Sequence, residues 1–210
     1  MHKTLFAARD KEQRKDALID AANAVFAERG FDAATTREIA ERAGCAEGLI
    51  HRYFAGKHGL LLAILERKTP QVMAEFDAGL PETDSLHDEV HQILLREIDA
   101  KWERRDFMRV CVARAAIDPE IGRAVRERVQ LAQVQVIERR LGRHQDAGRI
   151  RPDVDVNAIA ETLSGIGFAA GFMKLVAFGL PREEVTRYVQ EAATAIARGI
   201  STSQRKDTPQ

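Results

Sequence analysis

The stretch Thr35–Lys57, TTREIAERAGCAEGLIHRYFAGK, constrains this chain more than any other part of its sequence. Thr35 precedes a helical pattern and is followed by Glu38, an arrangement in which each side chain can cap the first turn of a helix. The pattern stops at Gly44, where a left-handed residue without a Cβ can end the helix. A second apolar face follows and consists of Leu49, Ile50, Tyr53 and Phe54. Two short helices with a glycine turn form the helix-turn-helix pattern, which places its second helix in a DNA major groove. An ordinary helical corner without a ligand is the alternative.

The segment from Ala17 to Leu62 resembles the N-terminal domain of tetracycline-repressor-type (TetR family) transcriptional regulators. The residues that carry the resemblance are Ala21-Ala22, Phe26-Ala27-Glu28-Arg29-Gly30-Phe31, Thr35-Thr36, Ile39-Ala40, Ala43-Gly44, Gly48, Tyr53-Phe54, Lys57 and Leu60. The remaining chain matches the family only in its length and helical character. The resemblance implies an all-α fold, with an N-terminal three-helix helix-turn-helix domain and a C-terminal helical domain for ligand binding and dimerisation. It also implies a regulator, expected to be a repressor, that binds a palindromic operator as a homodimer and is released by a small-molecule effector.

The motif predicts which side chains meet double-stranded DNA. Thr36, Arg52, Tyr53 and Lys57 are expected to contact phosphates, and Arg37 can also reach a guanine. The full set of predicted DNA-binding residues is Thr36, Arg37, Ala46, Glu47, Gly48, Leu49, His51, Arg52, Tyr53 and Lys57.

Four of these positions bear on the operator sequence, and three of them depart from the usual family pattern. Ala46 stands where Ser or Thr usually caps the helix, and His51 stands where a tyrosine is typical. Leu49 replaces a small or hydroxylic residue and would offer an apolar contact to a thymine methyl group. Glu47 could accept a hydrogen bond from a cytosine amino group, although its charge repels phosphate. We therefore expect an unusual operator sequence with the general binding mode retained.

The charge balance places any attraction to DNA in local segments. The chain has 32 Lys and Arg against 32 Asp and Glu, so it is not a polycation. Residues 1–15 are locally basic, and they are expected to form either a solvated terminus or an arm that follows phosphates. Two cysteines far apart, Cys45 and Cys111, suit a reducing cytoplasm. We expect no signal peptide, no membrane association and a cytoplasmic location.

The rest of the sequence predicts further helices and no strand. We expect residues 1–57 to bind DNA, residues 58–200 to bind the effector and dimerise, and residues 201–210 to form a disordered tail. The first helix should run from about Lys11 to Arg29. Pro70 should end or kink a helix, and Asp118 followed by Pro119 should begin another.

The helix expected over residues 157–178 carries no charge between Glu161 and Lys174, so it should be buried on all sides. One of its faces is a stripe of small residues that invites close approach by another helix, either from a second copy of the chain or from the same chain. The resemblance implies that the last two helices of each subunit form a four-helix dimer interface. The predicted interface residues are Ala160, Ser164, Gly167, Gly171, Ala192 and Ile196.

Two further sets of residues are candidates for small ligands. A pocket for a small apolar or amphipathic effector is predicted from Met73, Phe76, Trp102, Phe107, Met108, Phe168 and Phe172, although such residues are more often plain core. One helical face carries Asp84, His87, Asp88 and His91, which could bind a divalent metal but more often form a solvated face. We expect no resident metal and no cofactor. No nucleophile, base and oxyanion arrangement is recognisable, so an enzyme is a weaker alternative than a helical adaptor protein.

Overall fold

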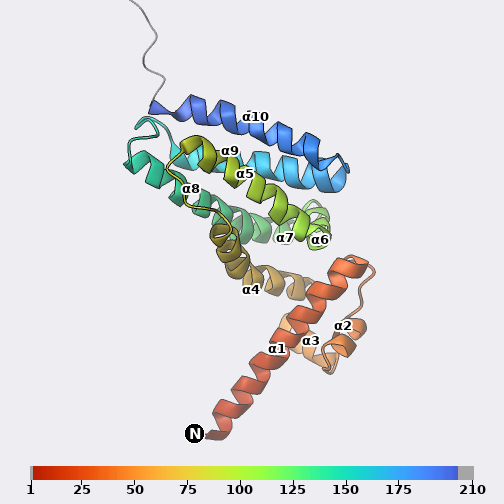
Figure 1. Cartoon of the computed structure of the whole chain (residues 1–210). Coiled ribbons are helices and arrows are strands. Elements are labelled where there is room, and N and C mark those ends of the chain that lie inside the picture. The colour runs from red at the N-terminus through yellow and green to blue at the C-terminus, as the bar shows by residue number, and fades with distance from the viewer. Residues whose placement is uncertain (1, 203–210) are drawn as a thin grey trace, which may run out of the picture. The chain divides into compact units, whose positions relative to one another are not determined.

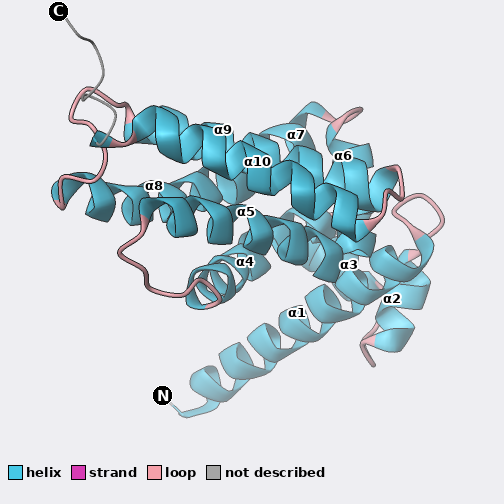
Figure 2. Cartoon of the chain, turned by 45° about the horizontal axis from the view of Figure 1, so that its top comes forward, coloured by secondary structure: helices cyan, strands magenta, loops and turns pink. Residues whose placement is uncertain are grey.

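The computed structural model describes residues 2–202, and all their regular elements are helical (Figures 1 and 2). The predicted all-α fold is therefore confirmed, and a single isolated bridge between Ile150 and Ser201 is the one β-type contact in the described region. The α-helices are α1 His2–Arg29, α2 Thr36–Arg42, α3 Gly48–Phe54, α4 Lys57–Ala78, α5 Leu86–Glu103, α6 Arg105–Ala115, α7 Pro119–Ala124, α8 Leu131–Asp146, α9 Val156–Phe168 and α10 Arg182–Ile200. Two π-helical segments, η1 Val125–Gln130 and η2 Ala169–Ala177, continue α7 and α9.

Several predicted helix ends differ from those observed. Helix α1 begins at His2 instead of near Lys11, so the basic N-terminal segment has a helical backbone. Helix α4 passes through Pro70 and ends at Ala78. The predicted cap of α7 is confirmed, because the side chain of Asp118 accepts hydrogen bonds from the backbone N–H groups of Glu120 and Ile121.

The chain divides into two compact units whose boundary differs from the predicted one after Lys57. Unit 1 comprises Met1–Gln71 and Asp106–Val129, and unit 2 comprises Val72–Arg105 and Gln130–Gln210. The difference arises because a three-helix core is too small to stand alone. Leucines of α4 and residues of α6 and α7 complete it. The buried core of unit 1 includes Leu18, Val25, Phe26, Ile39, Ile50, Leu60, Leu61, Ile64, Val110, Cys111 and Ile121.

Unit 2 is built around α5, which packs against α8, α9, η2 and α10. Its apolar core includes Met73, Phe76, Val90, Ile93, Leu94, Ile98, Val134, Ile137, Leu163, Val185 and Val189. By length and composition, the segment Val156–Ala177 could cross a membrane, but half of that window is buried inside the unit. The segment is therefore explained as a core helix.

The end of unit 2 extends beyond its predicted limit at residue 200. The backbone N–H of Thr202 donates to the carbonyl oxygen of Arg149 at 3.2 Å, and its hydroxyl donates to the carbonyl oxygen of Gly148 at 3.1 Å. Residues 201 and 202 are therefore held in place and do not belong to a disordered tail. The rest of the predicted tail, residues 203–210, lies outside the described residues.

Candidate nucleic-acid interface

The helix-turn-helix forms at the predicted place, and its capping differs in one respect. The hydroxyl oxygen of Thr35 accepts a hydrogen bond from the backbone N–H of Glu38 at 3.1 Å, as expected for the start of α2. The carboxylate of Glu38, however, pairs with Arg29 at 2.5 Å instead of capping Thr35. After α2, Gly44 has a positive φ of 62°, which opens the turn toward α3 at little steric cost.

The opening of α3 presents a row of exposed side chains. Ala46, Glu47, Gly48, His51 and Arg52 are all exposed. These residues precede and occupy the first part of α3, which is the part of a recognition helix that contacts base edges. The predicted base-reading positions are therefore accessible in unit 1.

Two residues of α3 that are predicted to contact DNA are partly buried by the protein itself. Leu49 is half-buried and packs against the core of unit 1, which limits the apolar surface it can offer to a thymine methyl group. Tyr53 is also half-buried, and the charged groups of Lys11 and Arg52 lie 5.8 and 6.0 Å from the centre of its ring. These cation–π contacts keep two positive charges beside the tyrosine.

A hydrogen bond joins the beginnings of α2 and α3. The hydroxyl of Thr36 donates to a carboxylate oxygen of Glu47 at 2.5 Å. A threonine hydroxyl carries only one hydrogen, so in this arrangement Thr36 cannot also donate to a phosphate. Without DNA, this hydrogen bond orients the carboxylate of Glu47. Nothing in the sequence pattern identified this pair, because the two residues are eleven positions apart.

Another predicted phosphate contact, Lys57, is similarly engaged. Its ammonium donates to the backbone carbonyl oxygens of Phe31, Asp32 and Ala34 at 2.8, 3.1 and 2.7 Å. These three bonds use all three N–H groups of the side chain. The predicted phosphate contact by Lys57 is thus not supported by the geometry. The residue instead ties the α1–α2 loop to the first turn of α4.

The start of α4 also depends on close backbone approach at Gly59. A Cβ added there would lie 1.7 Å from the carbonyl oxygen of Phe54, a distance that no side chain can adopt. Glycine at this position therefore lets α4 pass directly behind the end of α3. Together with the Lys57 contacts, this packing fixes α3 within unit 1.

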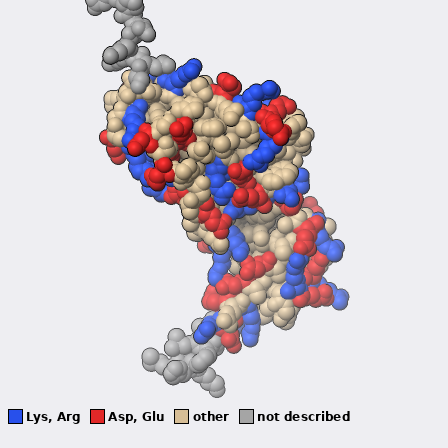
Figure 3. Space-filling model, viewed as in Figure 1, with Lys and Arg blue, Asp and Glu red and all other residues tan. Residues whose placement is uncertain are grey.

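The charges around the motif are mixed. Arg37 pairs with Glu41 at 2.9 Å, and Arg42 pairs with Glu28 at 2.6 Å. Lys and Arg atoms are interspersed with Asp and Glu atoms on the face shown in Figure 3. Among the described residues, Arg52 has no carboxylate partner, and it is exposed. Arg52 is therefore a cation that can meet a phosphate without first breaking an ion pair.

Comparison with known proteins agrees with this geometry. Residues 18–64 match the family model described as bacterial regulatory proteins, tetR family, and residues 80–192 match the model described as tetracyclin repressor-like, C-terminal domain. This chain belongs to the TetR family. Proteins of this family are DNA-binding transcriptional regulators, and this TetR-family protein shares both of their domains.

Individual relatives cover most of the chain. The HTH-type transcriptional repressor AcnR of Corynebacterium diphtheriae is 28% identical over 179 residues, which are 83% of this chain and 86% of AcnR. A TetR-family structure from Mesorhizobium loti superposes with a TM-score of 0.77 at 19% identity, covering 91% of this chain and 98% of that one. The fatty acid degradation regulator FadR from Bacillus halodurans gives 0.67 at 17% identity, covering 86% and 94%. At these identities the solved structures show a shared fold.

The seven residues predicted to line an effector pocket are distributed over both units. Phe107 and Met108 belong to unit 1, whereas the other five residues belong to unit 2. Met73 and Phe76 are buried in the core of unit 2, and Phe168 and Phe172 stack with their ring centres 5.4 Å apart. Trp102 is 43% exposed, and the guanidinium of Arg105 lies 4.7 Å from its ring centre. The sequence shows which residues are large and apolar, but it does not show whether they line one cavity.

An open cavity of about 600 Å³ does occur in unit 2, between the start of α5 and the end of α10. None of the seven predicted residues lines it. Its lining residues are Leu86, His87, Gly148, Arg149, Thr194, Ala197, Arg198, Ser201 and Thr202.

The acidic and histidine side chains near the start of α5 do not converge on a metal site. Asp84 pairs with Arg149, and the ring nitrogens of His87 lie 3.3 Å from Asp88 and 3.2 Å from the hydroxyl of Thr194. The rings of His87 and His91 have centres 6.1 Å apart. Among the side chains that the structure describes, those of residues 9–202, no group of three or more His, Cys, Asp or Glu residues is arranged to hold a metal ion.

The predicted dimer stripe is buried within one chain. Ala160, Ser164, Gly167 and Gly171 are all buried. A Cβ on Gly171 would lie 3.0 Å from Cβ of Lys101 and 3.1 Å from Cα of Ile98, so the stripe faces α5 of the same unit. The intrachain alternative is therefore correct for these four residues. The helical spacing of these small residues predicts a close contact with another helix, but it does not show which helix that is.

Proposed function

We propose that this TetR-family protein is a repressor that binds a palindromic operator as a homodimer and releases it when a small molecule binds the C-terminal domain. The exposed opening of α3, presented by a rigid helix-turn-helix, is the observation that carries the proposal. AcnR supports the repressor assignment, because it is named a repressor and is covered almost throughout its length. The DNA-binding residues we propose are Arg37, Ala46, Glu47, Gly48, His51, Arg52 and Tyr53.

A second small-residue face supports the homodimer. On α9, Ala158, Thr162 and Gly165 are exposed at successive helical turns. On α10, Tyr188, Ala195 and Gly199 are also exposed, with Ala192 half-buried between them. A Cβ on either Gly165 or Gly199 would meet nothing within 4 Å. We propose this outward face, together with the predicted Ala192 and Ile196, as the surface that packs against a second copy.

The Thr36–Glu47 contact gives the proposed operator a specific feature. The hydrogen bond holds a carboxylate beside the opening of α3, where it can accept from an exocyclic amino group of cytosine. It also places a negative charge where a phosphate would be repelled. The half-site should therefore contain a position at which Glu47 selects cytosine.

Selection from a random duplex pool tests the proposal. The unmodified protein should enrich a two-fold symmetric motif, since a symmetric dimer binds two equivalent half-sites. Glu47→Ala should lose the preference at one position of each half-site, by about 1–3 kcal/mol of discrimination. Thr36→Val should weaken the same preference, whereas Thr36→Ser keeps the hydroxyl and should retain it. An unenriched pool would refute the regulator assignment, and a motif indifferent to Glu47 would refute only its reading role.

A further inference from the structure

The central helix of unit 2, α5, buries two glutamates two turns apart, and their carboxylates differ in hydrogen bonding. Glu89 and Glu97 are 2% and 0% exposed. A buried carboxylate is costly unless its oxygens are paired and hydrogen-bonded, so the partners of each oxygen are informative.

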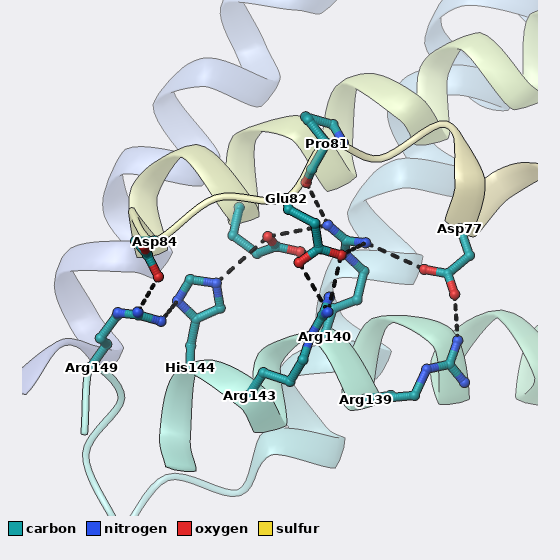
Figure 4. A network of polar contacts seen from close by, with 10 residues as sticks. Asp77, Pro81, Glu82, Asp84, Arg139, Arg140, Arg143, His144 and Arg149 are labelled. Carbon is teal, nitrogen blue, oxygen red and sulfur yellow. Dashed lines mark hydrogen bonds and ion pairs between the residues drawn. The ribbon is translucent and has the colours of Figure 1, made fainter. Parts of the chain in front are cut away.

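Glu89 is fully paired. Its Oε1 accepts from Nε of Arg140 at 2.5 Å, and its Oε2 accepts from Nη2 of Arg140 at 3.4 Å and lies 3.6 Å from Nε2 of His144. Nη1 of Arg140 donates to Asp77, and Nη2 also donates to the carbonyl oxygen of Pro81. Figure 4 shows this network, in which Arg139, Arg143 and Arg149 carry further ion pairs at its edge. Such complete pairing is what a purely structural buried carboxylate requires.

Glu97 is only half paired. Its Oε2 accepts from the ammonium of Lys101, which also donates to Oε1 of Gln133 at 3.3 Å. Its Oε1 is buried and has no hydrogen-bond partner among the described residues. Burial raises the pKa of the Glu97 carboxyl, although the charge of Lys101 opposes this effect. One acceptor in the centre of the unit is therefore left open, while the same helix satisfies another buried glutamate completely.

The neighbouring helix makes room for this group. A Cβ on Gly167 would lie 2.5 to 2.7 Å from Cγ, Cβ and Oε2 of Glu97, so any larger residue would displace the carboxylate. Directly after Gly167 and Phe168, the helix adopts the π-helical geometry of η2. Such distortions lower helix stability and often occur at functional sites. A glycine and the start of a π-helical segment thus lie beside the Glu97 side chain.

We infer that Glu97, with Lys101 and Gln133, is the polar anchor of an effector site that binds the uncharged hydrogen-bond donor, a hydroxyl or amide N–H, of a small amphipathic molecule. The inference rests on the proposed ligand-responsive function and assigns its site and ligand class. A donor would complete the shell of Glu97 Oε1 inside an apolar core.

Charged ligands fit the anchor less well. A carboxylate would approach an unpaired oxygen of its own sign. An ammonium would compete with Lys101 for the same glutamate and leave a second buried positive charge without a partner. The Glu97–Lys101 pair is neutral as a whole, and a neutral donor preserves that balance.

Isothermal titration of the full-length protein with four eight-carbon probes tests this assignment. 1-Octanol and octanamide carry a neutral donor, methyl octanoate carries only acceptors, and octanoate carries a negative charge. The two donors should bind about five- to tenfold more tightly than methyl octanoate, since one hydrogen bond is at stake. Failure of both donors to bind, or equal binding by octanoate or methyl octanoate, would overturn the inference.

Two glycine variants of unit 2 supply a matched control. Gly167→Ala forces Glu97 to move and should weaken the binding of 1-octanol about tenfold, whereas Gly142→Ala in α8 places its methyl group in open space and should not. The double variant Glu97→Leu/Lys101→Met removes both charges together, so it leaves no unpaired ion and should fold. It should bind 1-octanol and methyl octanoate equally, and a retained donor preference would refute the role of Glu97.

Duplex selection on the same samples separates this inference from the proposed function. An intact operator motif with no donor preference would overturn the ligand assignment alone. Absence of a motif would instead refute the DNA-binding function, whatever the probes do.

Discussion

Nε of Arg140 donates to Oε1 of Glu89 at 2.5 Å, and both side chains are almost completely buried. The pair joins α5 to α8, and through Asp77 and Pro81 it also holds the end of α4 and the loop that follows. Fully satisfied networks of this kind favour one arrangement of the surrounding elements, because every alternative leaves a buried charge unpaired. In this protein the network joins α5, α8, the end of α4 and the loop at Pro81 within unit 2.

Breaking the Arg140 pair should be costly. Arg140→Met should lower the free energy of unfolding by about 3–5 kcal/mol, because Glu89 would remain buried without its main partner. The double variant Glu89→Leu/Arg140→Met should recover more than half of that loss. Urea unfolding followed by circular dichroism measures both. A single variant as stable as the unmodified protein would contradict the assignment.

His144 should make stability depend on pH. Burial lowers the pKa of its imidazole, and the carboxylate of Glu89 opposes this only in part, while Arg149 and Arg143 reinforce it. A lowered pKa means that the folded state prefers the neutral ring, so the stabilisation is present above the ordinary pKa of about 6.5 and is lost as the pH falls below it. Between pH 7.5 and pH 5.5 the unmodified protein should therefore lose more stability than His144→Gln. Equal losses by urea unfolding at the two pH values would refute this role.

The sequence was sufficient for the helix-turn-helix but not for the partners of its polar side chains. The periodicity around Ile39 and Ile50 and the glycine at residue 44 are local signals, and local signals determine short helices and turns. The engagement of Thr36 with Glu47 and of Lys57 with the loop at Phe31 depends on chain packing over distances of eleven and 26 residues. The sequence could not show that the Thr36 hydroxyl and the Lys57 ammonium already bind acceptors of the protein itself.

Lys57 and Arg52 should therefore behave differently when replaced by alanine. Lys57→Ala removes three hydrogen bonds and should lower stability by about 1–3 kcal/mol, while leaving the salt dependence of operator binding unchanged. Arg52→Ala should reduce the slope of log affinity against log salt by about one per subunit, with little change in stability. Affinity measured over a series of salt concentrations distinguishes the two. A reduced slope for Lys57→Ala would show that its ammonium leaves the loop to contact DNA.

The two cysteines should differ in reactivity. Cys111 lies in the core of unit 1, where burial raises the pKa of its thiol to about 12. The thiolate is the reactive form, so Cys111 should resist alkylation at pH 8 until the protein unfolds. Cys45 is partly exposed at the turn and serves as the internal comparison. Mass spectrometry after iodoacetamide treatment should find Cys45 modified first; rapid modification of Cys111 in the folded protein would contradict its buried position.

The buried glycine stripe shows how far sequence could predict the interface. A stripe of small residues at helical spacing predicts a close helix contact, and Gly167 and Gly171 do make one. Nevertheless, the same helix carries a second small-residue face through Ala158 and Gly165, and both faces satisfy the same pattern. The position of α5 in the fold decides which of the two faces is buried within the chain.

The outward face should control dimerisation. Gly165→Trp or Ala195→Trp places a large side chain on an exposed surface, so the monomer should keep its fold while the dimer dissociation constant rises about ten- to a hundredfold. Gly167→Trp should instead destabilise the monomer, because its side chain would overlap Glu97. Sedimentation velocity over a range of concentrations, with circular dichroism as a check on folding, separates these effects. If Gly165→Trp stays dimeric at the concentrations at which the unmodified protein does, the subunits meet through another surface.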